Sequence, residues 1–245
     1  LLRMHASTQD PAHLASAVAA GDFNLTSEYP NLTPRFGSFM APFLHELSEV
    51  TGDSTYSDHA EDGFFDPLDA GTYGDTGSNW DTADWIGVVE TGRTGTWVNL
   101  RPWEFHLLIN TAAALGTPAQ EALFLAATLD GLDTLDNTDP GSVYSDILGL
   151  SGGVRGLGLS GTASFAPISS PLHPLINGID NLTDLANVLA ALQNGNGSWY
   201  WHSNLGSPGT SDEDTQTTAY AVLALVAAQE AGAGDYTSEI ALGRQ

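Results

Sequence analysis

Residues 189–228 read LAALQNGNGSWYWHSNLGSPGTSDEDTQTTAYAVLALVAA, and this stretch decides the fold. Its last part, Thr217 to Ala228, is apolar on every face after its first turn and consists of strong helix formers, so it predicts a buried helix. Further upstream, Asp180 to Gln193 predicts an amphipathic helix, because its leucines and Val188 recur at intervals of three and four residues. One enclosed helix beside one half-exposed helix indicates concentric helical layers.

The acidic patch before the buried helix contains Ser211, Asp212 and Asp214. A serine followed three residues later by an acid is typical of a helix N-terminus, where side-chain oxygens accept hydrogen bonds from free backbone N–H groups. Negative charge is also favoured there by the helix dipole. The patch therefore predicts a helix cap.

The loop between the two helices carries Gln193, Gly197 and Trp199 in the order Gln-x-x-x-Gly-x-Trp. With the leucines before it and the Thr-Ala-Tyr-Ala-x-Leu-Ala-Leu helix after it, this order resembles the Gln-Trp repeat of the terpenoid cyclase and prenyltransferase-like α/α toroids. In that family the glutamine and the tryptophan tie neighbouring helical hairpins together. The resemblance therefore implies an all-α fold, with hairpins arranged in a ring, and a structural role for these three residues.

The rest of the chain predicts further helices, separated by long Gly/Asp-rich loops. Prolines at first helical positions and glycines after last ones mark their ends. We expect one α/α-toroid-like domain over residues 1–245, which could belong to a longer chain. The expected helices are Pro11 to Ala20 with a stop at Gly21, Pro34 to a stop at Gly52, Trp80 to Val89, Pro102 to Leu115, and Pro118 to Leu132. Asp62 to Asp81 predicts a loop, and the glycine-rich residues from Ser151 to Ser164 predict a connector.

The composition excludes several classes of function. Thirty acidic residues against six basic ones, all of them arginine, give a net charge of -24, which argues against nucleic acid and against anionic membrane surfaces as partners. The absence of cysteine excludes disulfides, thiol nucleophiles, the Asp/Cys/His zinc site of protein prenyltransferases and the thioester bond of complement-like toroids. No apolar run approaches the ~18 residues that would span a bilayer.

Other features favour an extracellular or cell-surface location. Neither cysteine nor lysine occurs, and Gly, Thr, Ser and Asp are abundant. Acceptor sequons for N-glycosylation stand at Asn24, Asn31, Asn181 and Asn196, so we expect a glycoprotein. We expect no cofactor, because the EF-hand spacing is absent and the carboxylates of the acidic loops are expected to be solvated. The alternative is calcium, held in the oxygen-rich turns that carry Asp62, Asp66, Asp69, Asp75 and Asp81, and Asp130, Asp133, Asp136 and Asp139.

One set of residues could carry chemistry. Trp103, His106 and Asn110 share a helix face, because they lie three and four residues apart. A His or Tyr base beside Asn and Arg, which neutralise a uronate carboxylate, is how many α/α-toroid polysaccharide lyases work. The candidate catalytic residues are His106, Tyr200, Asn110 and Arg101. The candidate ligand-binding residues, which could form a platform for sugar rings, are Trp103, Trp199, Trp201, Tyr220 and His202.

Three hypotheses follow. The first is a secreted or cell-surface module without catalysis, which binds carbohydrate or neighbouring copies of itself and so self-assembles. The second is a carbohydrate-active enzyme, similar to a polysaccharide lyase, that uses the helix face of Trp103, His106 and Asn110 with Tyr200 or His202. The third is a distant relative of the terpenoid cyclases, in which Asp212 or Asp214 acts as the acid. An open cavity around His106 would favour the enzyme, and a fully enclosed imidazole would favour the first hypothesis.

Overall fold

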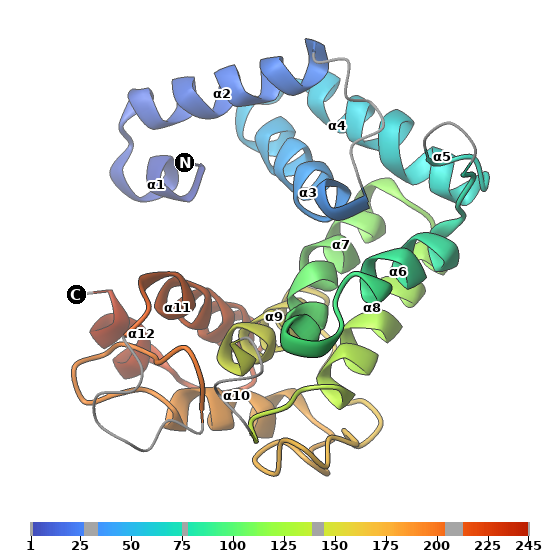
Figure 1. Cartoon of the computed structure of the whole chain (residues 1–245). Helices are drawn as coiled ribbons and strands as arrows, with labels where there is room; N and C mark the ends of the chain where they lie inside the picture. Colours follow the sequence, from blue (N-terminus) through green and yellow to red (C-terminus); the bar gives the residue numbers. More distant parts are fainter. Residues whose placement is uncertain (1, 27–33, 75–77, 139–144, 204–212, 245) are drawn as a thin grey trace. The chain divides into compact units, whose positions relative to one another are not determined.

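The computed structural model describes residues 2–26, 34–74, 78–138, 145–203 and 213–244 (Figure 1). Within these residues the backbone is helical with no strand, so the expected all-α class is confirmed. Isolated antiparallel bridges join Tyr73 to Trp80, Ser164 to Asn181, and Tyr200 to Glu213.

The helices follow one another along the whole described chain. They are α1 (Leu2–Thr8), α2 (Pro11–Thr26), α3 (Pro34–Thr51), α4 (Ser54–Ala60), the π-helix η1 (Glu61–Phe65), α5 (Asp66–Asp69), α6 (Thr82–Thr91), the 3-10 helix η2 (Gly95–Leu100), α7 (Arg101–Leu115), α8 (Pro118–Asp133), α9 (Asp146–Leu159), α10 (Leu182–Ala191), α11 (Thr215–Glu230) and α12 (Thr237–Gly243).

The chain divides into two compact units. Unit 1 consists of residues 1–88 and 111–121, and unit 2 consists of residues 89–110 and 122–245. In unit 1, α3 packs against α4, and the buried side chains include Leu44, Leu47, Phe65 and Leu68. In unit 2, α9 packs against α11, and α10 packs against both.

The stop predicted at Gly21, for the helix that begins at Pro11, is wrong, because α2 continues to Thr26. Gly21 is buried, and a Cβ atom on it would lie 2.4 Å from Cδ2 of Leu47 and 2.8 Å from Cε1 of Tyr56. The glycine therefore allows α2 to lie close to these side chains. The Tyr56 hydroxyl also donates a hydrogen bond to Oδ1 of Asp22, at 2.8 Å.

The loop expected from Asp62 to Asp81 is partly helical, since η1 and α5 occupy residues 61–69. The cause is aromatic packing that the acidic composition concealed. The buried ring of Phe64 makes edge-to-face contacts with Phe65, Tyr73 and Trp85, with centroids 5.1 to 5.4 Å apart. Such pairs add to the free energy gained by burial, so they override the low helix propensity of this segment.

The connector expected from Ser151 to Ser164 is also wrong. Residues 151–159 belong to α9, which is buried continuously from Asp146 to Gly158 and ends at Leu159. Its glycines allow neighbouring elements to approach more closely than any side chain would permit. A Cβ atom added to Gly149 would lie 1.9 Å from the Asn99 carbonyl oxygen, and one added to Gly152 would lie 2.5 Å from Cα of Trp103. A Cβ atom on Gly153 would lie 2.6 Å from Cδ2 of Leu132, and one on Gly156 would lie 3.1 Å from Cα of His106. On Gly158 the distance to the carbonyl carbon of Ala227 would be 2.8 Å.

The Gln193–Trp199 loop follows α10 in the chain and is fastened to α10 and α12 by hydrogen bonds. Nε2 of Gln193 donates hydrogen bonds to the carbonyl oxygens of Gly197, at 3.0 Å, and Glu239, at 2.8 Å. The fully buried indole of Trp199 donates to the carbonyl oxygen of Leu189, at 2.8 Å. Gly197 has a φ of 93°, and a Cβ atom there would lie 2.2 Å from the Leu242 carbonyl oxygen, so only glycine fits.

The helix cap predicted before α11 is confirmed at Asp214. Its carboxylate accepts hydrogen bonds from the backbone N–H of Thr217, at 2.7 Å, and from the Thr217 hydroxyl, at 2.6 Å. Ser211 and Asp212 lie outside the described residues.

We expect the substitution Asp214→Ala to lower the free energy of unfolding by ~1 kcal/mol, because it leaves an N-terminal N–H group of α11 without its acceptor. Asp214→Asn should retain most of the stability, since an asparagine oxygen caps a helix about as well. Urea unfolding followed by circular dichroism would measure both changes, and an equal loss in the two variants would contradict the capping role.

Candidate functional site

His106 lies on α7 and is fully buried. Its Nδ1 lies 2.5 Å from the carbonyl oxygen of Trp103, and its Nε2 lies 3.4 Å from Nη1 of Arg155. A guanidinium group can only donate, so Nε2 must accept and Nδ1 must carry the hydrogen. Both imidazole nitrogens are therefore engaged, and the hydrogen bonds run from Arg155 through His106 to the Trp103 carbonyl.

The surroundings of His106 favour its neutral form. Burial lowers the pKa of His106 to about 3, and the positive charge of Arg155 acts in the same direction. The hydrogen bond to the Trp103 carbonyl opposes this shift without cancelling it. His106 is thus uncharged at neutral pH.

The arginine beside His106 is Arg155, which the sequence did not single out. It lies on α9 with only 8% of its surface exposed. The expected partner, Arg101, instead donates hydrogen bonds from Nε to the carbonyl oxygen of Arg93, at 3.0 Å, and from Nη2 to that of Glu90, at 3.4 Å. The sequence signal that could have indicated a buried position for Arg155 is the spacing of the glycines around it, which fits a closely packed helix as well as a connector.

Trp103 and Tyr220 bring α7 and α11 together at this cluster. Their half-buried rings meet edge to face, with centroids 5.4 Å apart, and the ring of His106 lies 6.2 Å from that of Tyr220. Burial raises the pKa of Tyr220, whereas the charge of Arg155 and a hydrogen bond with Trp103 act in the opposite direction. Together Trp103, His106, Arg155 and Tyr220 form what we call the aromatic–arginine cluster.

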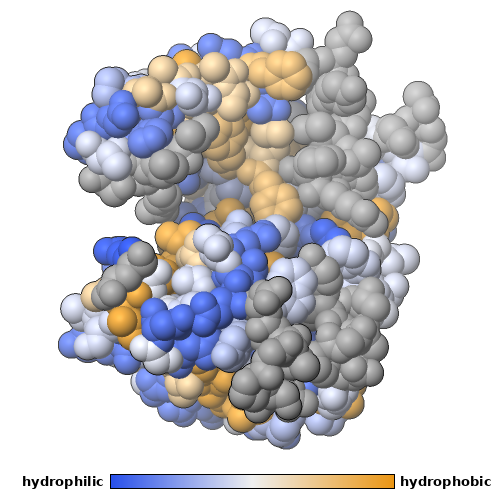
Figure 2. Space-filling model, turned by 60° about the vertical axis from the view of Figure 1, so that its left-hand side comes forward, coloured by the Kyte–Doolittle hydropathy of each residue, from blue (hydrophilic) through white to orange (hydrophobic). Residues whose placement is uncertain are grey.

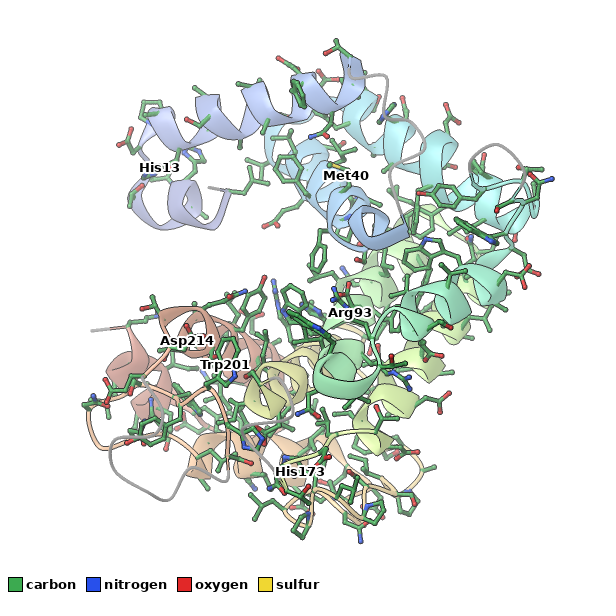
Figure 3. All side chains as sticks on the ribbon, in the orientation of Figure 1. His13, Met40, Arg93, His173, Trp201 and Asp214 are labelled. Atoms are coloured by element: carbon green, nitrogen blue, oxygen red, sulfur yellow. The ribbon has the colours of Figure 1, made fainter. Side chains whose placement is uncertain are left out.

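The other residues of the expected site lie elsewhere or serve the backbone. Asn110 is exposed on α7, and Tyr200 is half-buried and bridged to Glu213. Trp201 is half-buried next to it, on the loop before α11 (Figure 3). Asn99, which precedes α7 and is not among the expected site residues, is fully buried; it donates to the carbonyl oxygen of Asp136 and accepts from the Asp136 N–H, both at 2.7 Å.

His202 belongs to a second buried cluster, around Asp146 at the start of α9. Oδ1 of Asp146 lies 3.6 Å from Nδ1 of His202, and Oδ2 lies 2.9 Å from Nε2 of His173, on the loop that follows α9 (Figure 3). The backbone N–H and the hydroxyl of Ser203 also bond to this carboxylate. The cluster thereby fastens two loops to the N-terminus of the buried helix.

The buried histidine cluster and the acidic turns both carry side chains of types that bind metal ions. Among the residues that the structure describes, no three or more His, Cys, Asp or Glu side chains form a group that could hold a metal ion. Two carboxylates of the turns accept hydrogen bonds from the backbone: Asp133 from the N–H of Ser169, and Asp136 from that of Thr138. Asp75 and Asp139 lie outside the described residues. Calcium binding in these turns stays the alternative.

Three of the sequon asparagines use their amide groups in hydrogen bonds within the protein. Nδ2 of Asn24 donates to the carbonyl oxygen of Ala20, at 2.7 Å, and Nδ2 of Asn196 donates to Oε1 of Glu213, at 2.6 Å. Asn181 caps α10 by accepting from the Asp184 N–H, at 2.8 Å. Asn31 lies outside the described residues. In the described part of the chain, every helix is too short or too polar to cross a bilayer.

Comparison with known proteins adds no relative to this picture. No protein-family model, curated protein sequence or solved structure matches the chain.

Proposed function

We propose that this protein is a non-catalytic module, on the cell surface or outside the cell, that binds neutral carbohydrate at the aromatic–arginine cluster. The observation that carries the proposal is the pair of half-buried rings, Trp103 and Tyr220, next to the guanidinium of Arg155. His106 holds that guanidinium through a hydrogen bond and is itself inaccessible.

The state of His106 and Tyr220 disfavours the lyase alternative. A general base must reach the substrate proton and titrate near the working pH. His106 is enclosed, with both nitrogens engaged and a pKa lowered to about 3 by burial and by Arg155. The pKa of Tyr220 is raised by burial, so its phenol remains protonated at neutral pH. Neither group is suited to remove a proton from a sugar ring.

The chemistry of the cluster suits a neutral sugar. Aromatic rings supply large apolar surfaces at low entropic cost, and a sugar ring can cover them with its C–H groups. The net charge of -24 repels polyanionic glycans. Hydrophilic residues are interspersed with apolar ones on the face that Figure 2 presents.

We further propose that unit 2 is part of an α/α toroid. The enclosed helices α9 and α11 and the half-exposed helix α10 suit the inner and outer layers of such a ring. The hydrogen bonds of Gln193 and Trp199, which fasten the loop to α12 and α10, support the clasp that the Gln-Trp repeat implies.

We expect Tyr220→Ala to weaken the binding of a neutral oligosaccharide by about tenfold, because it removes one ring of the pair. Isothermal titration with panels of neutral and acidic oligosaccharides would measure this. Trp97→Ala is the matched control, since Trp97 is an exposed aromatic of unit 2 outside the cluster, with 43% of its surface accessible. An equal loss in both variants, or no binding of any neutral glycan, would refute the proposal. Release of shortened or unsaturated sugar products would refute the absence of catalysis.

A further inference from the structure

The loop that follows α9 lacks Asp, Glu, Lys and Arg until it reaches Asp180. Residues 156–179 contain none of these types, although they make up 15% of the chain and give it a net charge of -24. All of these residues belong to unit 2. Charged side chains normally lie at the surface, so a long surface loop in an acidic protein is expected to carry several of them. Their absence here marks this loop as different from the rest of the surface.

Within the loop, polar and apolar side chains have exchanged their usual places. We call residues 166–177 the proline–leucine loop. Leu172 and Leu175 are 49% and 47% exposed, whereas Ser170 and His173 are fully buried. Burial of a leucine is favourable and burial of a polar group is costly, so the opposite arrangement is informative. The loop presents its two leucines to whatever lies outside the chain.

The conformation that exposes the leucines is fixed by contacts with the rest of unit 2. The carbonyl oxygen of Leu172 accepts a hydrogen bond from the N–H of Asn137, at 3.0 Å. Nε2 of His173 lies 2.9 Å from Oδ2 of Asp146, at the start of α9 (Figure 3). A proline precedes each leucine in the sequence and restricts the backbone further. Because the loop is already ordered, a partner would bind it at a small cost in conformational entropy.

We propose that the proline–leucine loop is the face through which two copies of this chain associate. Charge indicates this partner. Each copy carries a net charge of -24, and in a two-fold contact the same face meets itself, so carboxylates in that face would lie against their like. A face without acidic residues avoids this cost. A basic partner would instead gain from carboxylates, so the loss of charge would weaken its binding.

Sedimentation equilibrium of the full chain tests this proposal, which does not depend on the carbohydrate site. The protein would be measured from about 5 to about 500 µM, in about 0.1 M and about 1 M NaCl. We expect an equilibrium between monomer and dimer. Its dissociation constant should fall at least about threefold at the higher salt concentration, because salt screens the repulsion between the acidic surfaces outside the contact.

Leu172→Asp and Leu175→Asp should each weaken dimerisation at least about tenfold, because each variant puts like charges into the contact. Both side chains are exposed, so the core of unit 2 stays unchanged, and circular dichroism would establish that each variant is folded. The matched control is Leu123→Asp. Leu123 on α8 is also an exposed leucine of unit 2, at 37%, but it lies outside the loop, so this change should leave dimerisation as it is.

A native protein that stays monomeric under all these conditions overturns the proposal. So do Leu172→Asp and Leu175→Asp variants that dimerise as tightly as the native chain, or a Leu123→Asp variant that loses as much affinity as they do. Co-sedimentation with neutral phosphatidylcholine vesicles distinguishes a membrane surface as the partner. Binding of the monomer to these vesicles, together with loss of that binding in Leu172→Asp, would assign the loop to a lipid surface and would also overturn the proposal.

Discussion

The substitution Gly152→Ala is expected to lower the free energy of unfolding by about 3 kcal/mol, although alanine is the better helix former by about 1 kcal/mol. The added Cβ atom would lie 2.5 Å from Cα and 2.8 Å from the backbone nitrogen of Trp103. Because both are backbone atoms, no side-chain rotation can relieve the overlap. α9 and α7 would have to move apart, and the buried contacts between them would be lost.

Gly87→Ala is the control for this experiment. Gly87 lies in α6, where an added Cβ atom meets no heavy atom within 4 Å, so the same change should be neutral or should stabilise by about 0.5 to 1 kcal/mol. Urea unfolding of both variants gives the two free energies. If Gly152→Ala is as stable as Gly87→Ala, then α9 does not pack against α7 as closely as described.

The second large expected effect is a loss of stability on acidification through His106. In the folded protein its pKa is about 3, against an ordinary value of 6.5, because the imidazole is buried beside Arg155. Below about pH 6.5 the unfolded chain therefore takes up a proton that the folded protein does not, until the pH approaches 3. Stability is highest above this window and falls as the pH is lowered through it, by ~2 kcal/mol between about pH 8 and pH 5 from this group alone.

The measurement is the free energy of unfolding in urea across this range, for the native protein and for His106→Asn. The other six histidines and all the carboxylates are common to both chains, so the difference in slope isolates His106. NMR of the imidazole nitrogens in the native protein gives a second readout that does not need the variant. A resonance of His106 that titrates near pH 6.5 in the folded state, or equal slopes for both chains, would contradict the expectation.

Local chemistry predicted many helix ends, and the contacts between helices could not be predicted. Pro34 and Pro118 begin helices, and Gly52 follows the end of α3, because these residues act through their own backbone torsions. The glycines of α9 instead act through what lies opposite them. Glycine is needed at 149 and 152 because Asn99 and Trp103, about fifty residues earlier in the chain, lie against these positions. The periodicity of residues within α9 does not indicate these contacts.

The candidate site divides in the same way. Trp103 and His106 share a helix face, which their spacing predicted. Arg155 and Tyr220 join them only because α9 and α11 pack on α7, so tertiary structure determines which arginine faces the imidazole. His202 was grouped with Tyr220 by sequence proximity, yet it contacts Asp146, because the loop after Trp199 leads its side chain to the start of α9.

The buried position of Arg155 also determines how readily trypsin cleaves the protein after this residue. The chain has no lysine, and its arginines are Arg3, Arg35, Arg93, Arg101, Arg155 and Arg244, so tryptic cleavage has few places to begin. A protease must pull several residues of extended backbone into its active site, whereas Arg155 lies within a helix that is buried along nearly its whole length. Cleavage after residue 155 therefore requires that α9 first leave the core, and its rate under native conditions reports how often unit 2 opens.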